Sequence, residues 1–234
     1  MYSFDIGKWV MKLIYSSSSF FTLLNFSRDK DAFIAYMNNL SLYSYTNDGS
    51  AIEHNDTLIK KSFAKELKEE VEHSLENYSN QIIVMLSTYI ETMHSEFFEG
   101  VFRKNNQFIY EYVSDSKDKK GFIRLNLIFE SESKEEIIDN LIIQAKKNVV
   151  NGSLERINQR IFKLTKYKID KQLIQDIQLN ILDKRNNIVH EASSPMIEKE
   201  EIILYFELVE KYLFELGRAC KKSGVLYDNQ GNWI

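Results

Sequence analysis

Three side chains that can act together on a phosphate lie close in the stretch LDKRNNIVHEAS, residues 182–193: Arg185, Asn186 and His190. An imidazole gives or takes a proton near neutral pH. A guanidinium offers planar donors that match phosphate oxygens, and an amide can orient either group or a ribose hydroxyl. These residue types, in this order, suit the cleavage of a phosphodiester.

Acidic side chains with the spacing of a metal site do not accompany these three residues in the sequence, which favours a metal-free route without a cofactor. In such a route the ribose 2′-hydroxyl attacks its own phosphate, so RNA and not DNA is the substrate. Glu91 and His94 have metal-compatible spacing on one expected helix, but no third ligand accompanies them. The sequence therefore predicts no metal ligand.

A helix expected over residues 170–191 must position these groups. At about 100° per residue, Asp183, Asn186 and His190 share one polar stripe, because they are three and four residues apart. Arg185 instead continues an apolar row, where a permanently charged guanidinium needs a partner or a route to the surface. The apolar arc consists of Leu173, Ile174, Ile177, Ile181 and Ile188, widened by Leu182 and Val189.

The composition indicates a mainly α fold. The 234 residues include one proline and eight glycines, and so few helix breakers favour long helices. The net charge of −4 gives no global positive field, and the single cysteine, Cys220, excludes an internal disulfide. No stretch has the length and apolarity of a membrane span, and the serine-interrupted N-terminal segment lacks a signal cleavage site. We therefore expect a cytoplasmic protein without a membrane partner.

The helical pattern divides the chain into three parts: an N-terminal extension over 1–57, a helical domain over 58–222 and a tail over 223–234. The domain begins with one long helix for which Gly100 is a stop signal. An insert at 101–132 is either a β-hairpin or irregular, because QFIYEYV and FIRLNLIFE are rich in aromatic and β-branched residues. The segment 44–56 is expected to be a polar loop, and amphipathic helices follow the insert at 133–150, 153–166, 170–191 and 198–222.

Positive charge gathers just before the Arg-Asn…His stretch. From Lys146 to Lys171, eight lysines and arginines face two acidic residues. Such a run is either a solvated surface or a local patch that attracts phosphate. On the second interpretation the RNA-binding candidates are Arg156, Arg160, Lys163 and Lys166.

The run RNNIVH, with the helices on either side of it, resembles the HEPN superfamily (higher eukaryotes and prokaryotes nucleotide-binding), whose hallmark is an Arg, often followed by Asn, and a His a few residues later. Its arrangement is most similar to the RiboL-PSP-type branch, and the resemblance covers roughly residues 75–220. It implies a helical bundle that dimerises and brings two such motifs into one cleft. Catalytic members are metal-independent endoribonucleases, many of them toxins or phage-defence effectors, so an antitoxin or a defence-system protein is an expected partner.

The resemblance also implies roles for individual residues. Arg185 would stabilise the phosphorane, His190 would act as general acid or base, and Asn186 would position one of them. Glu91 would orient Arg185. Apart from the resemblance, Asn187 next to Asn186 and Asp183 on the same polar stripe are further supporting candidates. The family includes non-catalytic members too, so a nucleotide- or protein-binding assembly module is the alternative. The apolar side chains of the last helix exceed the needs of one bundle face and predict a homodimer.

Overall fold

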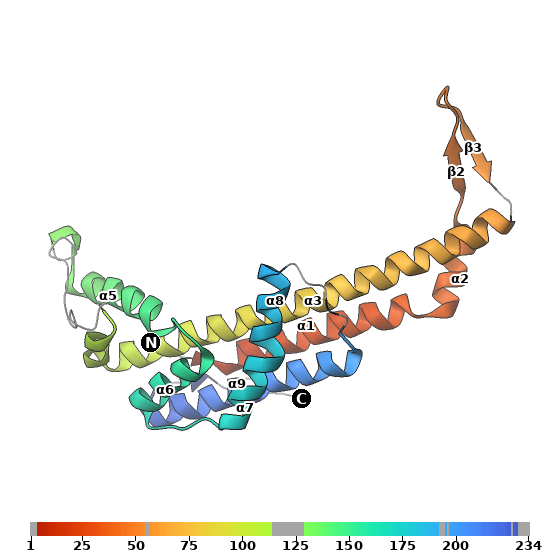
Figure 1. Cartoon of the computed structure of the whole chain (residues 1–234). Coiled ribbons are helices and arrows are strands. Elements are labelled where there is room, and N and C mark those ends of the chain that lie inside the picture. Colours follow the sequence, from red (N-terminus) through yellow and green to blue (C-terminus); the bar gives the residue numbers. More distant parts are fainter. Residues whose placement is uncertain are drawn as a thin grey trace.

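The computed structural model describes residues 4–54, 57–113, 129–191, 195, 197–225 and 227–228. Its longest element is α3 (Thr57–Lys104), whose 48 residues extend over about 70 Å at the usual helical rise. Helices α1 (Ile6–Ser27) and α9 (Lys199–Ser223) lie along the C-terminal half of α3 and form the main bundle (Figure 1). The predicted mainly α fold is confirmed.

The two halves of α3 differ, as their sequences predict. The N-terminal half is charged and largely exposed, whereas the C-terminal half buries a row of apolar side chains at helical spacing, among them Ile82, Leu86, Ile90 and Phe97. The helix does not stop at Gly100. Val101 and Phe102 are buried directly after it, and their packing outweighs the low helix propensity of a glycine.

Helix α9 lies at the centre of the bundle and contacts α1, α3, α6 and α7. Its N-terminus carries a capping box between Glu198 and Glu201. Gly217 lies directly against Ile6 of α1, and a β-carbon there would overlap with the Ile6 side chain. The apolar surface that predicted a dimer is mostly buried within one chain, including Tyr205 and Tyr212. It therefore no longer argues for a partner.

The N-terminal segment belongs to the same core. Helix α1 buries Trp9 and Phe20 among other apolar side chains, and the core cluster runs across the expected boundary at residue 57 without interruption. Asp5 caps α1 by accepting a hydrogen bond from the Lys8 amide at 2.8 Å. Strand β1 (Phe4–Asp5) pairs in parallel with β4 (Tyr227–Asp228), so the first and last described elements are neighbours.

A β-hairpin is present, but not where the sequence predicts it. After α2 (Lys30–Asn39), β2 (Leu42–Tyr45) and β3 (Ala51–His54) pair antiparallel in the segment expected to be a loop. The hairpin projects beyond the N-terminal end of α3 (Figure 1). Its turn places Gly49 at φ +85°, and the Thr46 amide donates to the Ser50 carbonyl at 2.9 Å. This positive φ is a backbone conformation that favours glycine.

For the insert the sequence left a β-hairpin and an irregular segment open, and a β-strand over its first part is wrong. QFIYEYV forms a 3₁₀ helix, η1 (Asn106–Glu111), because Ile109 and Val113, four residues apart, are both buried against the core. Most of FIRLNLIFE falls in 114–128, outside the described residues. Helix α5 (Lys134–Val149) follows, capped by Ser133 as predicted, and ion pairs from Glu99 to Lys146 and from Arg103 to Asp139 hold it to α3.

The remaining helices are α6 (Leu154–Thr165), α7 (Lys171–Ile177), the π-helical segment η3 (Gln178–Asp183) and α8 (Lys184–His190). The last three form one continuous column that crosses the bundle helices at a steep angle, with α8 at its free end (Figure 1). In the part of the chain that the structure describes, no helix is long and apolar enough to cross a membrane.

Candidate active site

The column α7–η3–α8 carries the Arg-Asn…His stretch. It begins at Asp170, whose side chain accepts a hydrogen bond from the Gln172 amide at 2.8 Å. Its inner face buries Ile174, Ile177 and Ile181, as the predicted apolar arc requires. The helix ends at His190, so the chemically competent residues occupy the last two turns of a helix that is anchored at its other end.

The π-helical turn in the middle of the column was not predicted. A π turn replaces i→i+4 hydrogen bonds by i→i+5 bonds, so the side chains after it are rotated relative to an ideal α-helix. At the regular spacing of an α-helix, Val189 is expected at the edge of the apolar arc and therefore partly buried. In the structure its side chain is 47% exposed. Such turns occur frequently at functional sites, and this one directly precedes Lys184 and Arg185.

Arg185 is half-buried, as its position beside the apolar row predicts. Its Nη1 donates a hydrogen bond to Oδ1 of Asn186 at 3.2 Å. Among the described residues it has no carboxylate partner. The guanidinium is thus held by an amide and keeps its positive charge available for an anion.

His190, Asn186 and Asn187 are exposed. Asp183 is exposed too, but its carboxylate accepts a hydrogen bond from Nε2 of Gln178 at 2.6 Å, across the π turn. Asp183 therefore supports the helix rather than Arg185. The structure keeps Asn186 and His190 on the open side of α8, where a large substrate can reach both.

Glu91 does not join this group. It is exposed on α3 and lines a cavity of about 310 Å³ together with His94, Asn151 and Leu182. Leu182 belongs to η3, so Glu91 faces the column, but within the described residues no hydrogen bond or ion pair connects it to Arg185. Its expected role in orienting Arg185 has no contact to support it.

Lys184 anchors the base of α8, a role that was not predicted from the sequence. Its Nζ donates to Oε1 of Glu201 at 2.7 Å and to the hydroxyl of Tyr205, which itself donates to Glu201 at 2.8 Å. Burial opposes the charged form of Lys184, but the hydrogen bonds from Lys184 to Glu201 and Tyr205 outweigh it and raise the pKa of Lys184. A lysine three residues after the buried Ile181 was the available signal, because that spacing faces a neighbouring helix.

His94 is a buried core histidine with a hydrogen-bond partner. It is 2% exposed, and its Nε2 lies 2.7 Å from the hydroxyl of Tyr212. The Tyr212 hydroxyl in turn donates to Oδ1 of Asn158 at 3.3 Å. Burial lowers the pKa of His94 to about 3, so the ring is neutral at physiological pH. No group of three or more metal-ligating side chains occurs in the described ranges, which cover His94 and Glu91.

The basic candidates before the site divide into two kinds. Lys163 forms an ion pair with Glu111, and that hydrogen bond raises the pKa of Lys163. Arg160 donates to backbone carbonyls, one of them that of Val149 at 2.6 Å. Arg156 and Lys166 are exposed, and neither side chain forms a hydrogen bond or ion pair within the described part of the chain. These two remain free to contact phosphates.

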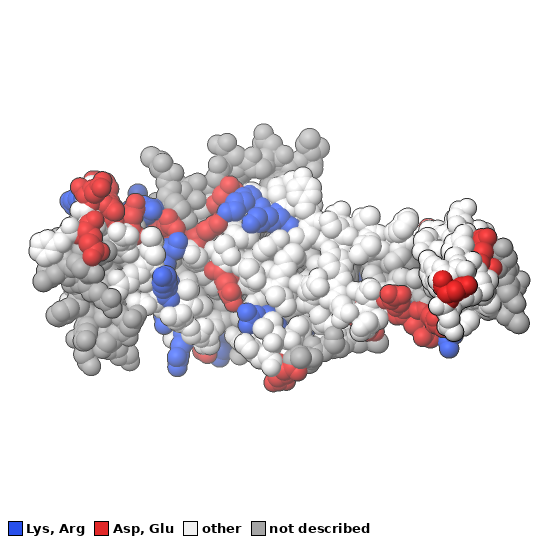
Figure 2. Space-filling view, turned by 90° about the horizontal axis from the view of Figure 1, so that it is seen from above, with Lys and Arg blue, Asp and Glu red and all other residues white. Residues whose placement is uncertain are grey.

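Charge on the face seen in Figure 2 is mixed rather than uniformly basic. Lysine and arginine side chains alternate with acidic ones over the bundle, and acidic side chains are prominent at the end that carries the hairpin. This pattern agrees with the overall charge of −4. Any attraction for a polyanion on that face is therefore local and not global.

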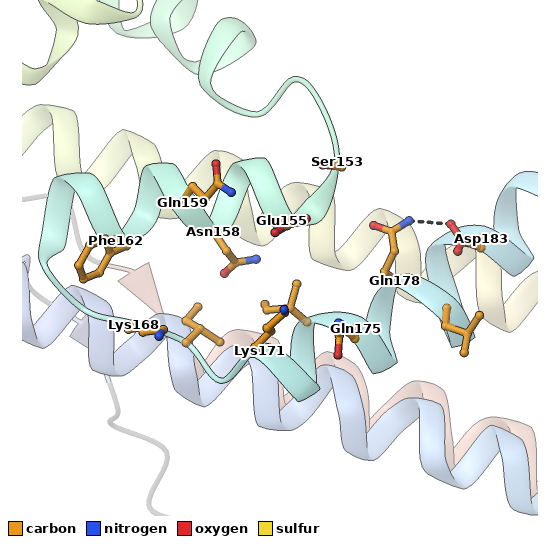
Figure 3. A pocket seen from close by; sticks show the side chains of 13 residues that line it. Ser153, Glu155, Asn158, Gln159, Phe162, Lys168, Lys171, Gln175, Gln178 and Asp183 are labelled. Atoms are coloured by element: carbon orange, nitrogen blue, oxygen red, sulfur yellow. Dashed lines mark hydrogen bonds between the residues drawn. The ribbon is translucent and has the colours of Figure 1, made fainter.

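A groove lies between α6 and the α7–η3 part of the column (Figure 3). It has a volume of about 630 Å³ and ends at Asp183, two residues before Arg185. Its lining combines apolar side chains with amides, two lysines and two carboxylates. Asn158 points into it from α6, and the Gln178–Asp183 hydrogen bond closes one end.

Comparisons with known proteins do not assign this chain to a family. No protein-family model matches it, and neither a curated protein nor a solved structure is significantly similar to it.

Proposed function

We propose that this chain is a metal-independent endoribonuclease of the HEPN type. The observation that carries the proposal is the arrangement at the end of the column. Arg185 is half-buried and hydrogen-bonded to Asn186, and it has no carboxylate partner among the described residues. His190 is exposed at the end of the same short helix. An oriented guanidinium and an accessible imidazole on one short helix match the needs of phosphodiester cleavage.

The reaction begins with the ribose 2′-hydroxyl, which attacks the adjacent phosphorus while an imidazole removes its proton. Arg185 binds the non-bridging oxygens, which gain negative charge as the phosphorane forms. The bond from phosphorus to the 5′-oxygen then breaks, and that oxygen takes up a proton. The products are a 2′,3′-cyclic phosphate and a 5′-hydroxyl, and no metal ion is required.

A second copy of the chain completes this scheme. One proton is removed and another is delivered on opposite sides of the phosphorus, and one imidazole serves only one of these positions at a time. Helix α8 projects from the bundle with His190 and Val189 exposed, so two copies can bring their α8 ends together. The dimer we propose therefore forms around α8, and not around the largely buried face of α9.

Purified protein incubated with single-stranded RNA tests the proposal. We expect cleavage that survives EDTA, products with the ends given above, no cleavage of DNA, and resistance of RNA with a 2′-methoxy group at the cleavage position. His190→Ala should lower the rate at least about 100-fold, the usual contribution of general acid–base catalysis. Because His190 is exposed, its free energy of unfolding should change by no more than about 0.5 kcal/mol.

Arg185→Ala should also abolish cleavage, but it should lower stability, because the stem of a half-buried arginine packs on apolar neighbours. Cleavage that needs magnesium and leaves 5′-phosphates would contradict the mechanism. Folded protein that binds nucleotides or a partner but never cleaves RNA would favour the alternative, a non-catalytic assembly module. If RNA is cleaved, growth arrest on induced expression, lost in His190→Ala, would support a toxin or defence effector.

A further inference from the structure

We propose that the groove between α6 and α7–η3 binds one unpaired nucleotide of an RNA strand, with its base against Phe162 and its phosphate near Lys168 and Lys171. This inference rests on the proposed function in that the strand is taken to be the substrate of Arg185. The volume of about 630 Å³ lies within the range of small-ligand sites.

The aromatic contribution comes from Phe162. Its side chain is 48% exposed, and it stands at one end of the groove, next to Lys168 (Figure 3). The floor beside it is apolar, since Ile169 and Ile174 line the groove and are almost fully buried. A flat apolar surface with an open phenyl ring suits a base that is not stacked within a duplex.

Hydrogen-bonding groups are available along the groove. The exposed Gln175 side chain has no hydrogen-bond partner among the described residues. The Gln178 side-chain amide uses its nitrogen for Asp183, which leaves its oxygen as an acceptor. Glu155 lines the α6 side and has no ion pair there. Amide and carboxylate oxygens accept hydrogen bonds from exocyclic amines. The groove should therefore prefer adenine, cytosine or guanine to uracil, which lacks an amine.

Charge favours a nucleotide over a bare base. Lys168 lies on the turn that leads into α7, and Lys171 is the first residue of α7. Both are exposed, and neither forms an ion pair with a described residue. The carboxylates of Glu155 and Asp183 belong to other parts of the lining, so the lysines remain the site for a phosphate.

The position of the groove points to a strand rather than to a free nucleotide. It ends at Asp183, and His190 lies seven residues further along the column, about 10 Å at the helical rise. A strand that leaves the groove at Asp183 and follows this side of the column reaches Asn186 and then His190. The side-chain oxygen of Asn186 accepts a hydrogen bond from Arg185. A docking helix from a protein would need a continuous apolar stripe, whereas this lining alternates amides and charges around the exposed Phe162 and Leu179.

The test measures binding without cleavage. Fluorescence anisotropy with a labelled single-stranded RNA carrying 2′-methoxy groups at all positions gives the affinity of the full chain. Phe162→Ala should weaken binding about 5- to 150-fold, the range for loss of one stacked base. Phe26→Ala, an equally simple change at a 69% exposed phenylalanine on α1, is the matched control and should bind as the unaltered protein does. Adenosine, cytidine and guanosine monophosphates should displace the RNA better than uridine monophosphate.

Equal affinities of the Phe162→Ala and unaltered proteins would overturn the proposal, as would equal displacement by all four nucleotides. Binding of free nucleotides without binding of the RNA would overturn the assignment to a strand. The two proposals can fail separately. If RNA is cleaved and Phe162→Ala has no effect on binding, the proposed nucleotide site is wrong and the proposed ribonuclease activity stands. If RNA binds in a Phe162-dependent way but is never cleaved, the nucleotide site stands and the ribonuclease activity is wrong.

Discussion

Acidification should destabilise this protein in part through one buried residue, His94. In the folded chain burial lowers the pKa of His94 to about 3 from an ordinary value of 6.5. Above pH 6.5 the ring is neutral in both the folded and the unfolded states, so it makes no pH-dependent contribution. Below pH 6.5 the unfolded chain binds a proton that the folded chain does not bind until about pH 3. The free energy of unfolding therefore falls between these values, by about 2 kcal/mol at pH 5.

The measurement is urea unfolding of the unaltered protein and of His94→Gln at pH 7 and pH 5. Glutamine can keep a hydrogen bond to Tyr212 but cannot titrate, so other acidic and basic groups cancel in the comparison. At pH 7 the variant should be less stable, because it loses the edge-to-face contact with the Tyr212 ring. That difference should shrink by about 2 kcal/mol at pH 5. His73→Gln, at an exposed position, controls for the loss of an imidazole in general. A difference that is the same at both pH values would refute the reasoning.

Three further predictions concern the site and its support. Glu201→Ala removes both the capping box of α9 and the partner of Lys184. It should therefore lower the free energy of unfolding, measured by urea titration, by about 1–2 kcal/mol. The control Glu200→Ala, at an exposed position, should have little effect. Arg156→Ala and Lys166→Ala should each reduce the salt dependence of RNA binding, by about 0.7 in the slope of log affinity against log salt, and an unchanged slope would assign both to a solvated surface. Light scattering at micromolar concentration should give the mass of two chains, and a monomer that cleaves RNA would rule out a site shared between copies.

Much of the helical fold could be predicted from the spacing of apolar residues along the sequence. Residues such as Ile82 and Leu86 recur at helical spacing, and this spacing predicts which helical face is buried. Helix N-termini with a side-chain cap, such as the one at Ser133, could also be predicted from the sequence. The hairpin was missed because its strands are short and bury almost nothing, although the turn sequence TNDGS between LYSY and AIEH was an available signal. The opposite error at η1 arose because tertiary burial of Ile109 overrode β propensity.

The candidate site was predictable in part. The half-buried Arg185 and the exposed His190 agree with the helical wheel, which depends only on local geometry. The π turn and the contact from Lys184 to Glu201 were not predictable from that wheel, because both depend on how the column meets α9. Glu91 was expected to orient Arg185 because of its position in the motif. Within the described residues no hydrogen bond or ion pair joins the two, because a sequence motif does not determine how α3 and the column pack together.

The central place of α9 has a consequence for the order of events during synthesis. Helix α1 is synthesised before its partner α9, and roughly 170 residues separate the end of α1 from the start of α9. At 5–20 residues per second this interval lasts about 10–30 s. During this interval the α1 side chains that pack on α9 have no packing partner; one of them is Ile6, which contacts Gly217 in the folded chain. A nascent chain that is released before α9 is complete would keep an apolar stripe of α1 exposed, so premature termination within the codons for α9 should yield aggregates rather than a smaller folded protein.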